Sequence, residues 1–288
     1  GSRYLDPDGS FPNHIPNPEN ETAMQSILDA VQESKADLGI IFDTDVDRAG
    51  AVLSDGTELN RNRIIAMMAA ILLREHPGTT IVTDSITSTG LAAFIRKHGG
   101  VHHRFKRGYR NVINESMRLN REGHDSQLAM ETSGHGALKE NYFLDDGAYL
   151  VTRLLIELAR AKKEGYTLES LIADLAEPAE SKEFRMNILV PDFKAYGQKI
   201  IDELNVYAAS QPGWSVAPDN FEGVRVNLDK AHGDGWFLLR LSLHDPLIPL
   251  NIESDSVGGV RQIAAELAPF LRPFDQLDTS ALLAFAGC

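Results

Sequence analysis

The chain has 288 residues, of which 43% are hydrophobic and 24% are charged, and its formal net charge is −13. This length and apolar content can bury the cores of roughly two or three domains, while the excess of acidic residues disfavours general binding to nucleic acid. The sequence contains no apolar run of about eighteen residues, so it predicts no membrane-spanning helix. The single cysteine, Cys288, excludes a disulfide framework and fits a cytoplasmic protein.

The first 58 residues have the pattern of a helix, a strand, an acidic loop and a second strand. Asn17 is predicted to cap the helix, with Pro18 at its first position. The apolar segment 39–42 predicts the first strand and the segment 51–54 predicts the second. Because an α/β unit normally opens with a strand, we expect this domain to begin upstream of residue 1.

From residue 61 onward, helical and strand patterns alternate, which predicts a mixed or parallel sheet covered by helices. The helices are expected at 61–75, 89–98, 110–120 and after Asp145-Asp146, and the strands at 80–84, 101–105 and 126–130. The alternation stops at a helical or irregular link over 165–182.

The last third of the chain has a different pattern, typical of a smaller α+β domain with an antiparallel sheet. Strands are expected at 184–190, 223–228, 235–242 and 248–253, and helices at 191–209 and 256–271. The tail 274–288 carries no strong signal. The predicted fold class is therefore α/β, with mixed-sheet domains followed by a smaller α+β domain.

An acidic loop, Asp43-x-Asp45-x-Asp47-Arg48, directly follows the first apolar strand. Three carboxylates on alternate residues of a tight loop repel one another unless a cation neutralises them, and ligands that are all oxygen suit Mg²⁺ before Ca²⁺. An EF-hand is disfavoured because Arg48 stands where that loop needs glycine. A solvated acidic loop is the alternative to a metal site.

A second loop, Glu131-Thr-Ser133-Gly-His135, follows the strand predicted at 126–130. Its polar side chains can bind a polyhydroxylated ligand, and its glycines let the backbone approach closely. Loops at the carboxyl ends of strands are the usual site of ligand binding in open α/β sheets. His135 could also act as an acid or base, whereas a plain capped turn is the alternative.

Two basic segments could bind phosphate. Lys106-Arg-Gly-Tyr109-Arg lies where a strand ends and a helix begins, so main-chain donors and cationic side chains can act together. Arg240-Leu-Ser242 follows the apolar strand segment 236–239 and could clamp a phosphate. Solvated polar turns are the alternative for both segments.

Taken together, these four segments resemble the phosphomannomutase/phosphoglucomutase family of α-D-phosphohexomutases. The metal loop of that family reads Asp-x-Asp-x-Asp-Arg, as in residues 43–48, and its sugar loop reads Gly-Glu-x-Ser-Gly-His, as in residues 131–135, with Met130 in place of the glycine. The resemblance covers roughly residues 8–270, and the two loops in this order are a specific signal.

The chain departs from the family pattern at two loops. The family reads Arg-x-Ser-Gly-Thr-Glu-Pro in its fourth domain, whereas Leu243, His244 and Asp245 stand here for Gly-Thr-Glu. Pro249 falls near the position of a later arginine. In the third domain, Tyr109 stands where many members have histidine. The departures leave open whether the fourth-domain loop binds phosphate.

The resemblance implies the following division of the chain. Residues 1–58 are the end of the second domain, 59–165 the third domain with the sugar loop, 166–182 a linker, 183–272 the fourth domain of phosphate-binding type, and 273–288 a tail. The first domain, which carries the phosphoserine of the family, would lie outside this chain. This missing amino-terminal domain would then be a partner of the chain within the same protein.

The function implied by the resemblance is transfer of a phosphoryl group between positions 1 and 6 of a hexose. Mannose or glucose 1-/6-phosphate would be the substrate, and Mg²⁺ the cofactor. The implied roles are metal binding by Asp43, Asp45 and Asp47, catalysis by Arg48 and His135, and substrate binding by Lys106, Tyr109, Glu131, Ser133, His135, Arg240 and Ser242. Without the phosphoserine domain, the chain is expected to be inactive alone.

Two other functions remain compatible with these residues. A metal-dependent phosphatase could use Asp43 as a nucleophile, since such enzymes also place an Asp-x-Asp pair after a strand. A non-catalytic relative could bind sugar phosphate without turnover, as the altered fourth-domain loop suggests. Neither interpretation involves nucleic acid or a membrane.

Overall fold

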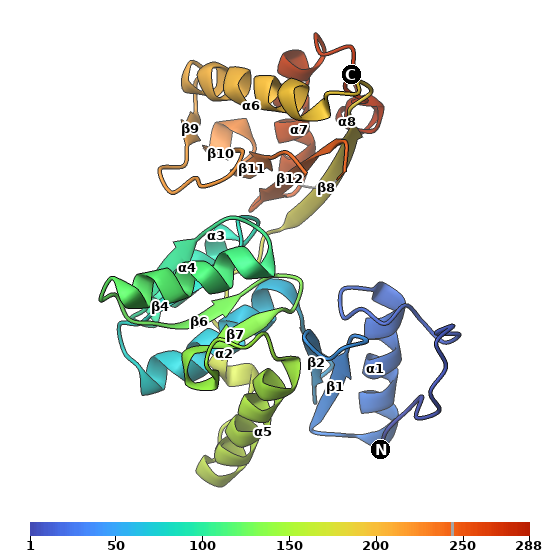
Figure 1. The fold of residues 1–288 in the computed structure, drawn as a ribbon, viewed down its shortest axis with the longest axis vertical. Helices are drawn as coiled ribbons and strands as arrows, with labels where there is room; N and C mark the ends of the chain where they lie inside the picture. The colour runs from blue at the N-terminus through green and yellow to red at the C-terminus, as the bar shows by residue number, and fades with distance from the viewer. Residues whose placement is uncertain (243–244) are drawn as a thin grey trace. The chain divides into compact units, whose positions relative to one another are not determined.

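The computed structural model describes residues 1–242 and 245–288, and the chain forms two compact units, Gly1–Ala176 and Glu177–Cys288. Figure 1 traces both units from the amino terminus in blue to the carboxyl terminus in red. Among the described helices, none is long and apolar enough to span a bilayer. Residues 243 and 244, two positions of the altered fourth-domain loop, lie outside the described residues.

Unit 1 opens with a small antiparallel sheet. Its strands are β1 (Leu38–Phe42), β2 (Ala49–Leu53) and β3 (Glu58–Leu59), in the order β1-β2-β3. Helix α1 (Glu21–Ser34) buries Met24 and Val31 in one cluster with Val52 of β2. This packing holds the β1–β2 loop, which carries the three aspartates, on a fixed hairpin.

The predicted helix start at Asn17 and Pro18 is wrong. Helix α1 begins at Glu21, because the side chain of Asn20 accepts a hydrogen bond from the Ala23 N–H and so caps the helix. Asn17 lies in the preceding turn, where its carbonyl accepts from the Asn20 N–H.

A second sheet forms the main part of unit 1. Its strand order is β5-β4-β6-β7, in which the first three are parallel and β7 runs antiparallel to β6. The strands are β4 (Thr80–Thr83), β5 (Val101–Arg104), β6 (Ser126–Met130) and β7 (Gly136–Leu138). Parallel strands end at the same edge of a sheet, so the loops that follow β4, β5 and β6 gather there.

Four helices accompany this sheet: α2 (Arg61–Glu75), α3 (Thr89–Lys97), α4 (Tyr109–Arg121) and α5 (Gly147–Glu164). Helix α2 is buried on nearly all sides from Ile64 to Leu73, as expected for a helix that is apolar around its whole circumference. Its side chains share one core with β4, β6 and α5. The alternating pattern predicted from residue 61 onward is confirmed.

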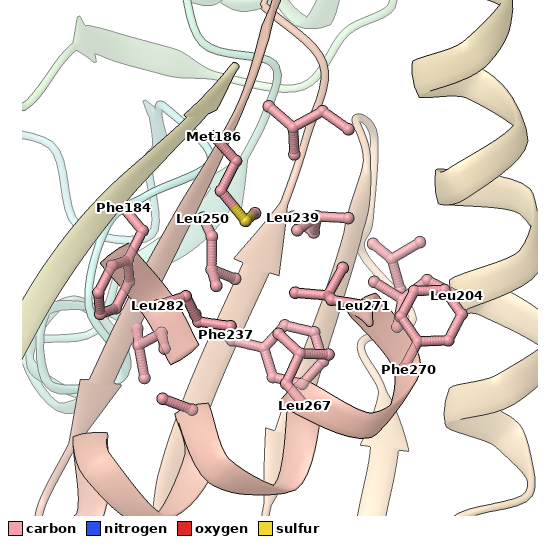
Figure 2. Packing of buried hydrophobic residues seen from close by; sticks show 14 of the residues in the cluster. Phe184, Met186, Leu204, Phe237, Leu239, Leu250, Leu267, Phe270, Leu271 and Leu282 are labelled. Atoms are coloured by element: carbon pink, nitrogen blue, oxygen red, sulfur yellow. The ribbon is translucent and has the colours of Figure 1, made fainter. Parts of the chain in front are cut away.

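Unit 2 contains a five-stranded antiparallel sheet in the order β8-β12-β11-β10-β9. The strands are β8 (Glu180–Asn187), β9 (Trp214–Val216), β10 (Val224–Leu228), β11 (Gly235–Leu239) and β12 (Leu247–Ser254), and the helices are α6 (Phe193–Ala209), α7 (Gly259–Leu271) and α8 (Ser280–Ala286). Figure 2 shows their shared core, in which Phe237 and Leu250 of the sheet face Leu267 of α7.

Unit 2 differs from the sequence pattern at several elements, among them the unpredicted short strand β9 and the end of β11 at Leu239 instead of residue 242. Strand β8 begins at Glu180, inside the predicted link, and ends at Asn187, before residue 190. The pattern also predicts nothing after residue 274, whereas α8 buries Leu282 in the core that contains Phe184. Seven residues are too few to show a helical period clearly, which explains the omission. The predicted fold class, α/β followed by a smaller α+β unit, is confirmed.

Candidate functional site

The loop between β1 and β2 carries the three aspartates and is closed by Arg48. The Arg48 Nε–H donates to Asp43 Oδ2 at 2.7 Å, and the Arg48 main-chain N–H donates to Asp43 Oδ1 at 3.2 Å. Arg48 also reaches back to Asn17 Oδ1 at 3.2 Å. Arg48 therefore fixes the first aspartate and ties the loop to the segment that precedes α1.

The three carboxylates converge. One oxygen from each of Asp43, Asp45 and Asp47 lies within 4.8 Å of the others. Asp47 Oδ1 is buried, and no hydrogen bond to it is found among the described residues. Its nearest cationic group among the described residues is Arg48 Nε, at 3.8 Å. A buried carboxylate oxygen without a hydrogen bond is costly unless a cation binds it, so these residues fit a hard divalent ion.

The pKa values of Asp43 and Asp47 in this loop are shifted in opposite directions. Burial favours the neutral form of Asp43, but the hydrogen bonds from Arg48 outweigh it and lower the pKa of Asp43. Burial raises the pKa of Asp47 to about 6, and the neighbouring carboxylates of Asp43 and Asp145 act in the same direction against the charge of His135. The ion-free loop therefore disfavours full ionisation, which a bound cation would restore.

The loop Glu131–His135 forms a tight turn between β6 and β7. The Glu131 N–H donates to the His135 carbonyl at 2.9 Å, and the Gly134 N–H donates to the Glu131 carbonyl at 3.1 Å. The buried Glu131 carboxylate accepts from the Gly108 N–H and, at 3.2 Å, from Ser133 Oγ. This turn thus contacts the loop that follows β5.

The two loops meet through main-chain and side-chain contacts. Arg48 and His135 form an isolated antiparallel β-bridge, and the Ala49 N–H donates to the Gly134 carbonyl at 3.5 Å. His135 Nδ1 lies 2.8 Å from Asp145 Oδ2 and 3.6 Å from Asp47 Oδ2. Residues from the first sheet and the second sheet of unit 1 therefore build one site.

His135 is held on two sides. Its Nδ1 is engaged by Asp145, whose other oxygen accepts from the Gly136 N–H at 3.1 Å. The Tyr109 ring stacks on the imidazole, with centroids 4.8 Å apart and planes inclined by 19°. Burial lowers the pKa of His135, but the hydrogen bond and charge of Asp145, together with Asp47, outweigh burial and raise it. The imidazole is therefore oriented and biased toward its charged form.

The remaining predicted residues lie in two places. Lys106 is exposed in the loop that follows β5, beside Gly108, whose N–H binds Glu131. Arg240 and Ser242 belong to unit 2, after β11, where their main-chain N–H groups donate to Pro249 and Leu247 of β12. The predictions that concern Leu243 and His244 lie outside the described residues.

Sequence reasoning overlooked three side chains of this site: Asp145, Asp84 and Thr132. The pair Asp145-Asp146 reads as a helix cap, and Asp146 does cap α5 by accepting from the Tyr149 N–H. A helix cap needs only one aspartate, so the second carboxylate of the pair was the sequence signal for a role of Asp145 in the site. Asp84 and Thr132 are buried, and their sequence context does not reveal that.

Replacement of Gly134 tests the contact between the two loops. Gly134 has φ +99°, and a Cβ there would lie 3.0 Å from the Ala49 carbonyl oxygen. We expect Gly134→Ala to cost about 2–3 kcal/mol, of which about 1 reflects the backbone conformation alone. Gly123→Ala is the matched control, since Gly123 has φ +87° but open space around its Cβ position. Equal losses in chemical denaturation would contradict a role for the loop contact.

Two family models match the chain. Residues 2–56 match the model described as phosphoglucomutase/phosphomannomutase, alpha/beta/alpha domain II, and residues 60–178 match alpha/beta/alpha domain III. The matches cover more than half of the sequence. The chain belongs to the phosphoglucomutase/phosphomannomutase family. The three aspartates lie in the domain II match, and the Glu131–His135 loop lies in the domain III match.

Curated members of the phosphoglucomutase/phosphomannomutase family align along most of the chain. A phosphoglucomutase of Neisseria meningitidis serogroup A is 30% identical over 261 residues, which are 90% of this chain and 53% of that protein. A phosphomannomutase/phosphoglucomutase of Pseudomonas putida is 32% identical over 262 residues, 90% of this chain and 52% of that protein. The chain thus spans about half the length of these relatives.

A solved structure of the same family has a similar fold. The phosphoglucomutase/phosphomannomutase family protein of Burkholderia thailandensis superposes with a TM-score of 0.76 at 29% sequence identity. The superposition covers 95% of this chain and 55% of that chain.

Proposed function

We propose that this chain supplies the metal and sugar-recognition sites of a phosphohexomutase that moves a phosphoryl group between positions 1 and 6 of a hexose. The observation that carries the proposal is the β-bridge between Arg48 and His135, which joins the three-aspartate loop to the Glu131–His135 loop. Membership of the phosphoglucomutase/phosphomannomutase family supports the same activity. Mannose or glucose 1-/6-phosphate is the proposed substrate.

Mg²⁺ is the proposed ion, held by Asp43, Asp45 and Asp47. Their oxygens converge, and Asp47 Oδ1, which is buried without a hydrogen bond from the described residues, suits a cation that prefers oxygen ligands. Bound there, the ion would neutralise charge on the phosphoryl group during transfer. Arg48 orients Asp43 and so sets the shape of the ligand cage.

Sugar recognition is assigned to the second loop. The Glu131 carboxylate accepts hydrogen bonds, Ser133 both donates and accepts, and each suits a sugar hydroxyl. Because Asp145 engages Nδ1 of His135, Nε2 is the nitrogen that would bind a ligand or transfer a proton. Tyr109 supports the imidazole ring by stacking.

Phosphate binding is assigned to basic residues outside this loop. Lys106 stands in the loop next to Glu131 and suits the phosphate of a bound hexose. Arg240 and Ser242 of unit 2 are proposed to hold the phosphate that does not react. The phosphoserine donor of the family would complete the cycle from another domain, and a cytoplasmic location is part of the proposal.

The phosphatase alternative requires Asp43 to attack phosphorus. Both Asp43 oxygens accept hydrogen bonds from Arg48, and the side chain is 1% exposed. A carboxylate that is buried and doubly engaged is a poor nucleophile, so the geometry favours a ligand role for Asp43.

Calorimetric titration of the 288-residue chain with α-D-glucose 1-phosphate and α-D-mannose 1-phosphate, with and without Mg²⁺, tests the proposal. We expect binding that Glu131→Gln and His135→Ala weaken by about tenfold each, the size of a lost hydrogen bond to a polar ligand. Glu122→Gln is the control, since Glu122 is an exposed partner of Arg118 in α4.

Three other results would contradict the proposal. Absence of hexose-phosphate binding under all conditions would remove the sugar site. Release of inorganic phosphate by the wild-type chain, abolished by Asp43→Asn, would establish the phosphatase. Binding without isomerisation by the full-length protein would identify a non-catalytic relative.

A further inference from the structure

Asp84 is a fully buried acid at the ligand-binding edge of the second sheet. It directly follows β4 and is 0% exposed. Its Oδ2 accepts a hydrogen bond from Thr132 Oγ1 at 2.7 Å. Its Oδ1 is also buried, and no hydrogen bond to that atom is found within the described part of the chain. Burial of a carboxyl group that is only partly satisfied costs stability, so its presence requires a reason.

The local turn does not need this carboxyl group. The turn Asp84–Thr87 is closed by the Asp84 main-chain carbonyl, which accepts from Thr87 Oγ1 at 3.0 Å and from the Thr87 N–H at 3.5 Å. The side chain of Asp84 instead reaches across the sheet edge to the loop after β6. Its partner there, Thr132, is itself 4% exposed.

Thr132 is the central residue between two groups assigned to sugar binding. Glu131 precedes it and binds the Gly108 N–H, while Ser133 follows it and donates to Glu131. The path from Asp84 to Gly108 therefore has two hydrogen bonds, Thr132 to Asp84 and Gly108 to Glu131, joined by the peptide bond between Glu131 and Thr132. It connects the loops that follow β4, β6 and β5.

We propose that Asp84 is a positioning residue, which holds the Glu131–His135 loop in its ligand-binding conformation through Thr132. The inference rests on the proposed function in taking a hexose phosphate as the ligand of that loop. Asp84 is too deeply buried to touch the ligand itself. Its effect is to aim the side chains on either side of Thr132.

The electrostatic surroundings of Asp84 support this role. Burial raises the pKa of Asp84 to about 7, the charge of Arg107 lowers it, and the charge of Glu131 raises it. The carboxyl group thus interacts with charged groups from both neighbouring loops in addition to Thr132. An asparagine would keep an oxygen acceptor for Thr132 and remove the ionisable group, so Asp84→Asn is the conservative variant.

The experiment compares Asp84→Ala, Asp84→Asn, Thr132→Val and Thr132→Ser in the 288-residue chain. The first measurement is hydrogen exchange of the main-chain amides in residues 131–135, which needs no ligand. The second is the affinity for α-D-glucose 1-phosphate. Asp125→Asn is the matched control, because Asp125 lies at the opposite end of β6, where it accepts from Gln127 and Lys139.

We expect Asp84→Ala and Thr132→Val to speed exchange in the loop and to weaken ligand binding by about tenfold, the size of one buried hydrogen bond. Asp84→Asn and Thr132→Ser should stay within about threefold of wild type. The double variant Asp84→Ala/Thr132→Val should lose no more affinity than the single variant with the larger loss, because the hydrogen bond that Thr132→Val removes is already absent in Asp84→Ala.

Three results would overturn the inference: unchanged loop exchange in Asp84→Ala, additive losses in the double variant, or an equal loss in Thr132→Ser and Thr132→Val. If Asp84→Ala does not fold, the Thr132 pair still decides the question. If the wild-type chain binds no hexose phosphate, the proposed function fails, while loop exchange continues to test Asp84.

Discussion

Asp47→Asn is expected to remove most of the Mg²⁺ affinity while making the ion-free protein more stable. The substitution takes away one of three convergent carboxylates, and even outer contacts of metal sites are worth 10- to 100-fold, so we expect a loss of at least about 100-fold. In the absence of the ion, the same carboxylate is held close to Asp43 and Asp145, which disfavour its charge.

The sign of the stability change follows from the pKa of Asp47. Folding raises it from 3.8 to about 6, so the unfolded chain gives up this proton at lower pH than the folded chain. The ionised group therefore destabilises the folded state progressively above pH 4, and fully above pH 6. A neutral asparagine removes this penalty, and we expect a gain of about 1–2 kcal/mol at neutral pH that disappears below pH 4.

Calorimetric Mg²⁺ titration and thermal unfolding, in EDTA and in saturating Mg²⁺, measure both effects. Asp55→Asn is the control, because Asp55 is an exposed turn residue that accepts from the Thr57 N–H, and asparagine can do the same. Unchanged Mg²⁺ affinity in Asp47→Asn would remove Asp47 from the metal site. If Asp47→Asn were less stable than wild type in EDTA, repulsion among the three carboxylates would not be destabilising the folded chain.

As the pH rises from about 4 to about 7, unit 1 of the wild-type chain is expected to lose stability relative to unit 1 of Asp84→Asn. Burial raises the pKa of Asp84 from 3.8 to about 7, so in this range the unfolded chain is ionised while the folded chain keeps its proton. Fewer protons on the unfolded state mean that stability declines with pH. The three-unit difference corresponds to about 4 kcal/mol at most.

Unit 1 and unit 2 can be followed separately in this measurement. Both tryptophans, Trp214 and Trp236, lie in unit 2, so their fluorescence reports unfolding of unit 2. Hydrogen exchange of the buried helix α2 reports opening of unit 1. The pH-dependent difference should appear in α2 and be absent from the tryptophan signal. An equal dependence in wild type and Asp84→Asn would show that Asp84 is ionised throughout the range.

The long elements were predictable because they carry a clear period, whereas the short ones were not. Helix α2 and strand β6 continue for enough residues to show their pattern, but β7 has three residues and β3 has two. The start of α1 was misplaced because Asn17 and Asn20 are both competent caps, and only the folded chain selects Asn20.

The candidate site was partly predictable for a similar reason. The alternate spacing of Asp43, Asp45 and Asp47 already implied that they converge, and their oxygens do lie together. The contact of His135 with Asp145 depends on β7 folding back on β6, which no local pattern reveals. The assigned roles of these residues stay predictions until ion and ligand binding are measured.

The bridge between Arg48 and His135 has a mechanical consequence for the proposed reaction. Because it joins the two loops within one compact unit, the ion and the sugar-binding groups keep a constant separation. When a hexose reacts first at one end and then at the other, these two loops cannot move relative to each other to accommodate the change of orientation. In the proposed reaction, the ligand would therefore have to turn relative to this fixed pair of loops between the two steps.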